Sequence, residues 1–158
     1  MRPLLLCCLL ACGAPAPPPP AAPTVEALAG WLGEAGLPPE RHGDILRSVV
    51  TAPWGPLGLT AQVDAEHQLV LLATQGLLTL DVAPDPPHLV LLVTNLATIN
   101  YELPQGKLQL NAETGEIVLS IELETDEGLG RPTFTRAVTR LQAVATQVRP
   151  RLVQAATP

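Results

Sequence analysis

The sequence has few aromatic residues, few charged residues and no cysteine beyond position 12. Aromatic side chains make up only 3% of the 158 residues, which argues against aromatic-lined platforms for bases or sugars. Nine Lys and Arg residues stand against fifteen Asp and Glu, and this balance would repel a phosphate backbone. No apolar run reaches the length of about 20 residues that a membrane-spanning helix needs. The composition therefore excludes a nucleic-acid binder, a disulfide scaffold and a multi-span membrane protein.

The N-terminal segment has the order of an export signal. Arg2 precedes an apolar run over residues 4–14, and Pro15 ends that run. Within it, Leu9-Leu10-Ala11-Cys12 resembles a bacterial lipobox, in which cleavage behind a small residue exposes a cysteine thiol for acylation. The resemblance implies that residues 1–11 are a lipoprotein signal peptide and that Cys12 is lipidated. An ordinary signal peptide and a chance apolar start on a cytoplasmic protein are the alternatives.

Residues 12–23 are rich in proline and follow the proposed acylation site directly. Such a segment forms a semi-rigid polyproline II spacer of about 3.1 Å per residue, which would hold a folded domain on the order of 30 Å from a membrane. A PxxP recognition ligand is the alternative interpretation. Gly13, rather than Asp, follows Cys12, and in Gram-negative lipoproteins this implies export to the periplasmic face of the outer membrane.

Residues 24–156 are expected to form one domain, since 47% of the sequence is hydrophobic and this length buries a core without disulfide or metal staples. Thr24 is the expected N-cap of a helix over 25–36, and Gly36 suits its C-terminal cap. Residues 40–50 are predicted to form a second, weaker helical piece. Alternating apolar residues then predict strands over 57–63, 68–74 and 77–82, joined by short turns into an antiparallel meander.

The second half of the chain is predicted to hold a helix, a β-hairpin and a final helix. Asp85 as N-cap and Pro86 at the first helical position favour a helix over 86–100, although residues 90–93 would also suit a strand. Its expected apolar face consists of Leu89, Leu92, Val93, Leu96 and Ile99. The hairpin pairs 107–111 with 117–123 around Gly115, and its buried face is expected to contain Leu108, Leu110, Ile117, Leu119 and Ile121. The last helix starts near Pro132, with an inner face of Phe134, Ala137, Val138, Leu141, Val144, Ala145, Val148 and Leu152.

These elements give the order α-βββ-α-ββ-α, which predicts an α+β fold with an antiparallel sheet of about five strands. The order, and above all the segments 96–103, 106–111 and 115–119, resembles the YbjN family and the wider type III secretion chaperone-like fold. In that family, a helix carrying asparagines leads into a hairpin marked by glycine and then a C-terminal helix. The resemblance covers about residues 25–152. It implies a small, often dimeric domain that binds a protein or peptide without catalysing a reaction.

Side chains that could support chemistry are scattered. His42, His67 and His88 stand alone, whereas a zinc site needs three or four converging ligands. Neither Ser48 nor Ser120 lies in a nucleophile elbow, and Ser120 is expected on the outer face of its strand. The acidic residues Glu122, Glu124, Asp126 and Glu127 lack the spacing of a calcium loop and are expected to be solvated. Asn95, flanked by apolar residues, is expected to be partly buried with its amide bonded to the backbone, and a structural role is favoured over ligand binding for Asn95 and Asn100. We therefore predict no catalytic residue, no cofactor and no metal.

Three functions of different classes remain open from the sequence. The favoured one is a non-enzymatic envelope lipoprotein whose tethered domain recognises a protein partner through its sheet or a sheet edge. A structural or assembly lipoprotein of the envelope is the first alternative, and an unrecognised enzyme is the second. If the signal is spurious, the resemblance instead implies a cytoplasmic YbjN-like regulator or chaperone. A homodimer built from sheet or helix faces is expected in either compartment.

Overall fold

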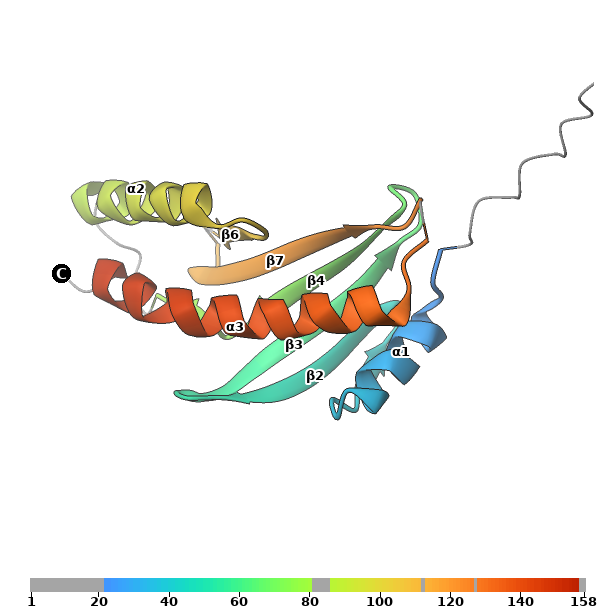
Figure 1. Cartoon of the computed structure of the whole chain (residues 1–158). Helices are drawn as coiled ribbons and strands as arrows, with labels where there is room; N and C mark the ends of the chain where they lie inside the picture. Colours follow the sequence, from blue (N-terminus) through green and yellow to red (C-terminus); the bar gives the residue numbers. More distant parts are fainter. Residues whose placement is uncertain (1–21, 81–85, 112, 127, 157–158) are drawn as a thin grey trace, which may run out of the picture.

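The computed structural model describes residues 22–80, 86–111, 113–126 and 128–156 (Figure 1). Three helices, α1 (Val25–Glu34), α2 (Pro86–Glu102) and α3 (Arg131–Ala156), accompany seven strands. The strands are β1 (Glu40–His42), β2 (Ile45–Ala52), β3 (Gly55–Asp64), β4 (Leu69–Gln75), β5 (Leu78–Thr79), β6 (Lys107–Leu110) and β7 (Glu116–Glu124). All strand pairs are antiparallel, which confirms the α+β class. No helix of the described part has both the length and the apolar character needed to cross a bilayer.

The sheet has two more strands than expected, because residues 40–52 are extended. The prediction of a helical piece over 40–50 was wrong: β1 and β2 occupy this segment. Within β2 the side chains of Leu46, Ser48 and Val50 are buried, while those of Arg47 and Val49 are exposed, which is the two-residue period of a strand. β2 then pairs with β3 along its whole length.

The expected three-strand meander is also corrected. β4 pairs with residues 120–124 of β7, and β5 pairs with residues 116–117 of the same strand. Because both pairings are antiparallel, β5 continues in the direction of β4, and the chain does not reverse at Gln75-Gly76. The sheet order is β1-β2-β3-β4-β7, and β6 also pairs with β7, over residues 117–120.

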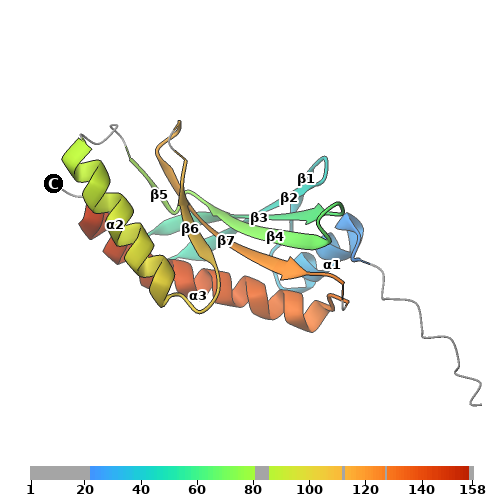
Figure 2. The ribbon, with the colours of Figure 1, turned by 90° about the horizontal axis from the view of Figure 1, so that it is seen from above.

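Helices α1 and α3 cover one face of the curved sheet (Figures 1 and 2). All eight residues predicted for the inner face of α3, from Phe134 to Leu152, are buried. The ring of Trp31 in α1 lies 5.5 Å from that of Phe134, which joins the two helices over the core. Thr24 caps α1 as predicted, with its hydroxyl accepting a bond from the Ala27 amide.

The hairpin of β6 and β7 supplies much of the remaining core. Leu108, Ile117, Leu119 and Ile121 are buried as predicted, whereas Leu110 is only half-buried. Residues 86–102 form a helix, but its predicted apolar face is only partly correct. Leu92, Leu96 and Ile99 are buried, while Leu89 and Val93 are exposed. The predicted N-cap, Asp85, lies outside the described residues.

Candidate protein-binding surfaces

The first candidate surface is the open edge of β2. β1 pairs only with residues 45–47 of β2, so among the described residues no strand covers 48–52 on that side. We call residues 48–52 the β2 edge. Val49 in its centre is 67% exposed. An uncovered strand of this length can accept an added strand from another chain.

The register identifies which backbone groups of the β2 edge point outward. Thr51 stands opposite Pro56 of β3, and proline has no N–H to donate. Opposite residues in an antiparallel ladder alternately exchange two hydrogen bonds or none, so Thr51 and Pro56 form a non-hydrogen-bonded pair. Val49 and Gly58, two positions along, are therefore also non-hydrogen-bonded. The N–H and C=O groups of Val49 and Thr51 consequently face away from β3, toward the open edge.

A hollow of about 440 Å³ lies beside this edge, and we call it the β2 groove. Its walls come from the end of α1, from β2 and from α3, and its lining residues are Ala35, Gly36, Leu37, Val49, Val50, Thr51, Thr135, Val138, Thr139 and Gln142. The Ser48 hydroxyl donates to the Leu37 carbonyl at 3.1 Å and so fixes the segment after α1 against β2. The β2 groove combines outward backbone groups with apolar and hydroxyl side chains, which is the composition of a site for an extended peptide.

The second candidate surface is the outward side of α2, which stands at the end of the molecule beside the C-terminal half of α3 (Figures 1 and 2). Its large exposed residues are Leu89, Val90, Leu91, Val93 and Tyr101. We call this set the α2 outer face. A helix that is apolar on all sides is normally covered on all sides, so this face is suited to contact another protein surface.

Asn100 has a structural role, as predicted. Its side-chain amide donates to the Leu108 carbonyl at 2.9 Å and accepts from the Leu108 amide at 2.7 Å. These two bonds imitate a strand partner and attach the end of α2 to β6. Asn95 is half-buried and donates to the Leu91 carbonyl of its own helix at 3.0 Å. Both side chains therefore serve the fold.

The two histidines whose side chains are described, His42 and His67, lie beside different carboxylates. His42 lies 3.8 Å from Glu40 in β1, and His67 lies 2.9 Å from Asp64 at the turn after β3. Bonds from the His67 backbone and side chain lower the pKa of Asp64. The side chain of His88 is not among those described. Within the described residues, no three His, Cys, Asp or Glu side chains are arranged to hold a metal ion.

The two serines lie in strands of the sheet, and the acidic residues of 122–126 lie at the end of β7 and after it. Ser48 and Ser120 are both buried. Ser120 lies on the face of β7 opposite to Leu119 and Ile121, as predicted, but its side chain is buried there, with its hydroxyl 3.5 Å from the Lys107 carbonyl of β6. Glu122 is exposed and lies 3.6 Å from Lys107 across the hairpin. Glu124 and Asp126 are likewise exposed, whereas Glu127 lies outside the described residues.

Cys12, the predicted lipidation site, lies outside the described residues, as do the signal segment 1–11 and most of the tether 12–23. The folded part can be compared with known proteins. The profile of the YbjN family, described as "Putative bacterial sensory transduction regulator", matches residues 24–154. The chain belongs to the YbjN family. No curated protein matches it.

Solved structures share the fold at low sequence identity. The crystal structure of YbjN from E. coli is 15% identical, with a TM-score of 0.60 over 83% of this chain and 95% of that one. The ExsC–ExsE complex gives 19% identity and a TM-score of 0.60 over 81% and 92%. The HopA1–SchA chaperone–effector complex gives 18% identity and a TM-score of 0.53 over 78% and 90%. The YbjN fold and the chaperone-like fold of the resemblance are thus both found among its structural neighbours.

Sequence reasoning missed the β2 edge, because residues 40–50 were assigned to a helix. The signal was present in the sequence: Leu46, Ser48 and Val50 alternate with polar or exposed positions, and Val49-Val50-Thr51 is a β-branched run. β-branched residues favour strands over helices. The Pro38-Pro39 break suggested a second helical piece instead.

Proposed function

We propose that this protein is a lipid-anchored, non-enzymatic envelope protein whose YbjN domain binds an extended segment of a partner protein at the β2 edge. The observation that carries the proposal is the pair of outward-facing backbone positions, Val49 and Thr51, above the β2 groove. An added strand would bond to these groups and place alternate side chains in the groove. Two structural neighbours are complexes, the ExsC–ExsE complex and the HopA1–SchA chaperone–effector complex, which supports a protein-binding use of this fold.

The proposed anchor rests on the N-terminal sequence. Ala11 and Cys12 supply the small residue and the thiol that lipoprotein processing requires, and the proline-rich residues up to Pro23 would space the domain from the bilayer. In a Gram-negative cell, Gly13 after the acylated cysteine favours the periplasmic face of the outer membrane. A partner protein in the envelope would then be the ligand of the β2 groove.

Replacing Val49 with proline should weaken partner binding by about tenfold or more, because it removes one outward N–H from the β2 edge. The fold should persist, since the Val49 N–H makes no bond to β3 and proline is tolerated at a strand edge. Binding is measured by quantifying the partner recovered with each variant from solubilised membranes, and stability by thermal unfolding. Val49→Thr keeps the backbone donor and should retain the partner. Equal recovery with a folded Val49→Pro variant would refute the β2 edge as the site.

We further propose that two copies associate through the α2 outer face. Four of its five residues are aliphatic and none is charged, so the contact would not depend on ion pairs. Hydrophobic association is not screened by salt, whereas exposed ion pairs are. Light scattering of the chain carrying Cys12→Ser should therefore give a dimer mass that rises with concentration and persists in high salt. A monomer mass throughout would contradict the dimer, and dissociation by salt alone would contradict its apolar contact.

A further inference from the structure

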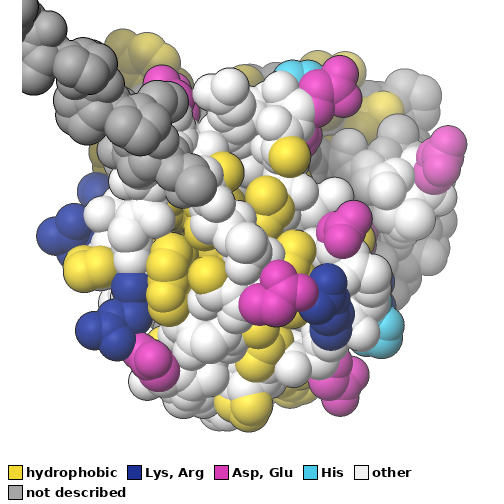
Figure 3. All heavy atoms as spheres, turned by 90° about the vertical axis from the view of Figure 1, so that its right-hand side faces the viewer, with side chains coloured by type: hydrophobic (Ala, Val, Ile, Leu, Met, Phe, Trp, Pro, Cys, Tyr) yellow, Lys and Arg dark blue, Asp and Glu magenta, His cyan; other side chains and the backbone are white. Residues whose placement is uncertain are grey.

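Positive charge is concentrated on one helix of this acidic protein. α3 carries five of the nine cationic residues and none of the fifteen acidic ones: Arg131, Arg136, Arg140, Arg149 and Arg151. The rest of the chain retains four cationic residues against fifteen acidic ones. In the end-on view of Figure 3, most of the Lys and Arg side chains visible on this face lie at the left, the side on which α3 lies. α3 therefore presents a local positive surface on a negative molecule.

Arg136 and Arg140 have no carboxylate partner among the described residues, and the third arginine without one, Arg149, donates to the Leu77 carbonyl and lies over the Trp54 ring. Arg131 pairs with Glu34 of α1, and Arg151 with Glu102 of α2 at 2.6 Å. Arg136 instead donates to the Thr133 hydroxyl, and Arg140 to the Gln105 side-chain carbonyl at 2.8 Å. Within the part of the chain that the structure describes, neither of these two makes an ion pair.

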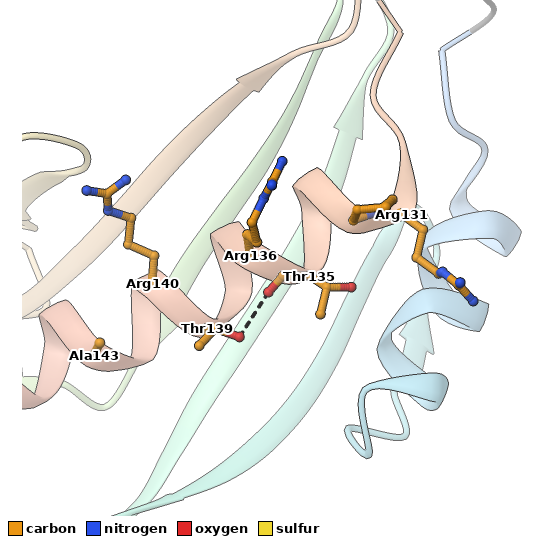
Figure 4. A pocket seen from close by; sticks show the side chains of 7 residues that line it. Arg131, Thr135, Arg136, Thr139, Arg140 and Ala143 are labelled. Carbon is orange, nitrogen blue, oxygen red and sulfur yellow. Dashed lines mark hydrogen bonds between the residues drawn. The ribbon is translucent and has the colours of Figure 1, made fainter.

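The spacing of Arg136 and Arg140 costs stability. The two are four residues apart and project from the same side of α3 (Figure 4). Like charges at this spacing weaken a helix, and α3 has no carboxylate to offset them. Their exposed guanidinium groups therefore place two like charges side by side without a benefit to folding. A ligand with two neighbouring carboxylates would neutralise both charges.

The arginine pair projects from α3 on the side away from β2 (Figure 4), and a second hollow connects it to the β2 groove. Arg131, Arg136 and Arg140 line a shallow hollow of about 540 Å³ on the outer side of α3, together with Pro132, Thr135, Thr139 and Ala143. Thr135 and Thr139 also line the β2 groove, so the two surfaces are continuous across α3. A segment that leaves the groove and crosses α3 over Thr135 and Thr139 can reach the arginines.

We infer that the partner segment of the β2 groove is acidic and that its carboxylates contact Arg136 and Arg140. This inference rests on the proposed function and adds the chemistry of the ligand. Guanidinium groups bind carboxylates through paired N–H donors, so arginine is the suitable cation for this contact. An anionic bilayer suits the surface less well, because it would repel the acidic remainder of the domain.

The test uses the purified full chain and a fluorescein-labelled 20-residue peptide of alternating Glu and Ser, which places all carboxylates on one side of an extended strand. Fluorescence anisotropy measures its affinity, with the same peptide carrying Gln in place of Glu as the neutral comparison. The double substitution Arg136→Gln and Arg140→Gln should weaken binding of the acidic peptide by about tenfold. The matched control, Arg41→Gln with Arg47→Gln, removes the same charge from β1 and β2 and should change the affinity by less than about twofold.

Equal weakening by both double substitutions would overturn the inference, since net charge alone would then explain binding. So would an equal affinity for the Gln peptide, or an absence of binding to the acidic one. Binding to vesicles of phosphatidylcholine and phosphatidylglycerol that depends on Arg136 and Arg140, without peptide binding, would assign the surface to lipid instead. Val49→Pro separates the two proposals. If the Arg136→Gln and Arg140→Gln variant loses peptide binding and Val49→Pro retains it, the arginines contact the peptide but the β2 edge is not its binding site.

Discussion

Replacing Leu119 with alanine is expected to lower the free energy of unfolding by about 2–5 kcal/mol, because the substitution leaves a cavity in a packed core. Leu119 is fully buried in β7, directly opposite Leu108 of β6. A loss of this size is a large part of the stability of a typical domain. Chemical denaturation of the wild-type protein and the Leu119→Ala variant measures the difference, provided that the free energy of unfolding depends on denaturant concentration with the same slope in both.

Val118→Ala is the matched control, since Val118 is the neighbouring residue, is only half-buried and points to the opposite face of the strand. Its substitution should cost clearly less. If Leu119→Ala leaves the unfolding midpoint unchanged, or if Val118→Ala costs as much, then Leu119 does not face the core and β7 pairs in a different register.

Replacing Cys12 with serine should move the protein from the membrane fraction to the soluble fraction, or leave it unprocessed. A serine hydroxyl does not accept the diacylglyceryl group that the cysteine thiol accepts, and without acyl chains the tether has no hold on the bilayer. Metabolic labelling with a fatty acid, followed by fractionation, measures both effects. Cys8→Ser is the control and should retain the label, because Cys8 follows the bulkier Cys7. If the Cys12→Ser protein still incorporates the labelled fatty acid, Cys12 is not the lipidated residue.

The amphipathic elements of this fold could be predicted from sequence because their periodicity reports burial directly. The eight inner residues of α3 recur at helical spacing, and the β6–β7 hairpin alternates around Gly115, which adopts the positive φ that the turn needs. In each case a single face is buried, so one pattern identifies both the element and its core side. Thr24 was also assigned correctly, since capping is a local property of its side chain, and the structural role expected for Asn100 is confirmed by its bonds to Leu108.

The rest depended on tertiary pairing that local patterns do not contain. In residues 45–52 the strand alternation spans only a few apolar positions, and pairing with β3 decides that the segment is extended. Likewise, Gln75-Gly76 has the composition of a turn, but β7 pairs with the strands on both sides of it, so the chain bends there without reversing. Leu89 and Val93 fit a helical stripe, yet α2 packs through Leu92, Leu96 and Ile99 and leaves those two side chains on the α2 outer face.

These errors explain why the candidate site was the least predictable feature. The β2 edge exists only because β1 stops short of residue 48, and its outward donors follow from the position of Pro56 on the next strand. The positive surface of α3 depends on Arg136 and Arg140 lying beyond the reach of the described acidic residues of the sheet. Both features combine residues far apart in the sequence.

The most direct measurement of strand addition is hydrogen exchange at individual backbone amides of β2, with and without the bound partner. The amides of Val49 and Thr51 point outward and should exchange fast in the free protein, while those of Ser48 and Val50 bond to β3 and should already be protected. Partner binding at the β2 edge predicts that exchange slows at Val49 and Thr51 and stays slow at Ser48 and Val50. Unchanged fast exchange at Val49 and Thr51 in the partner-bound protein would contradict it.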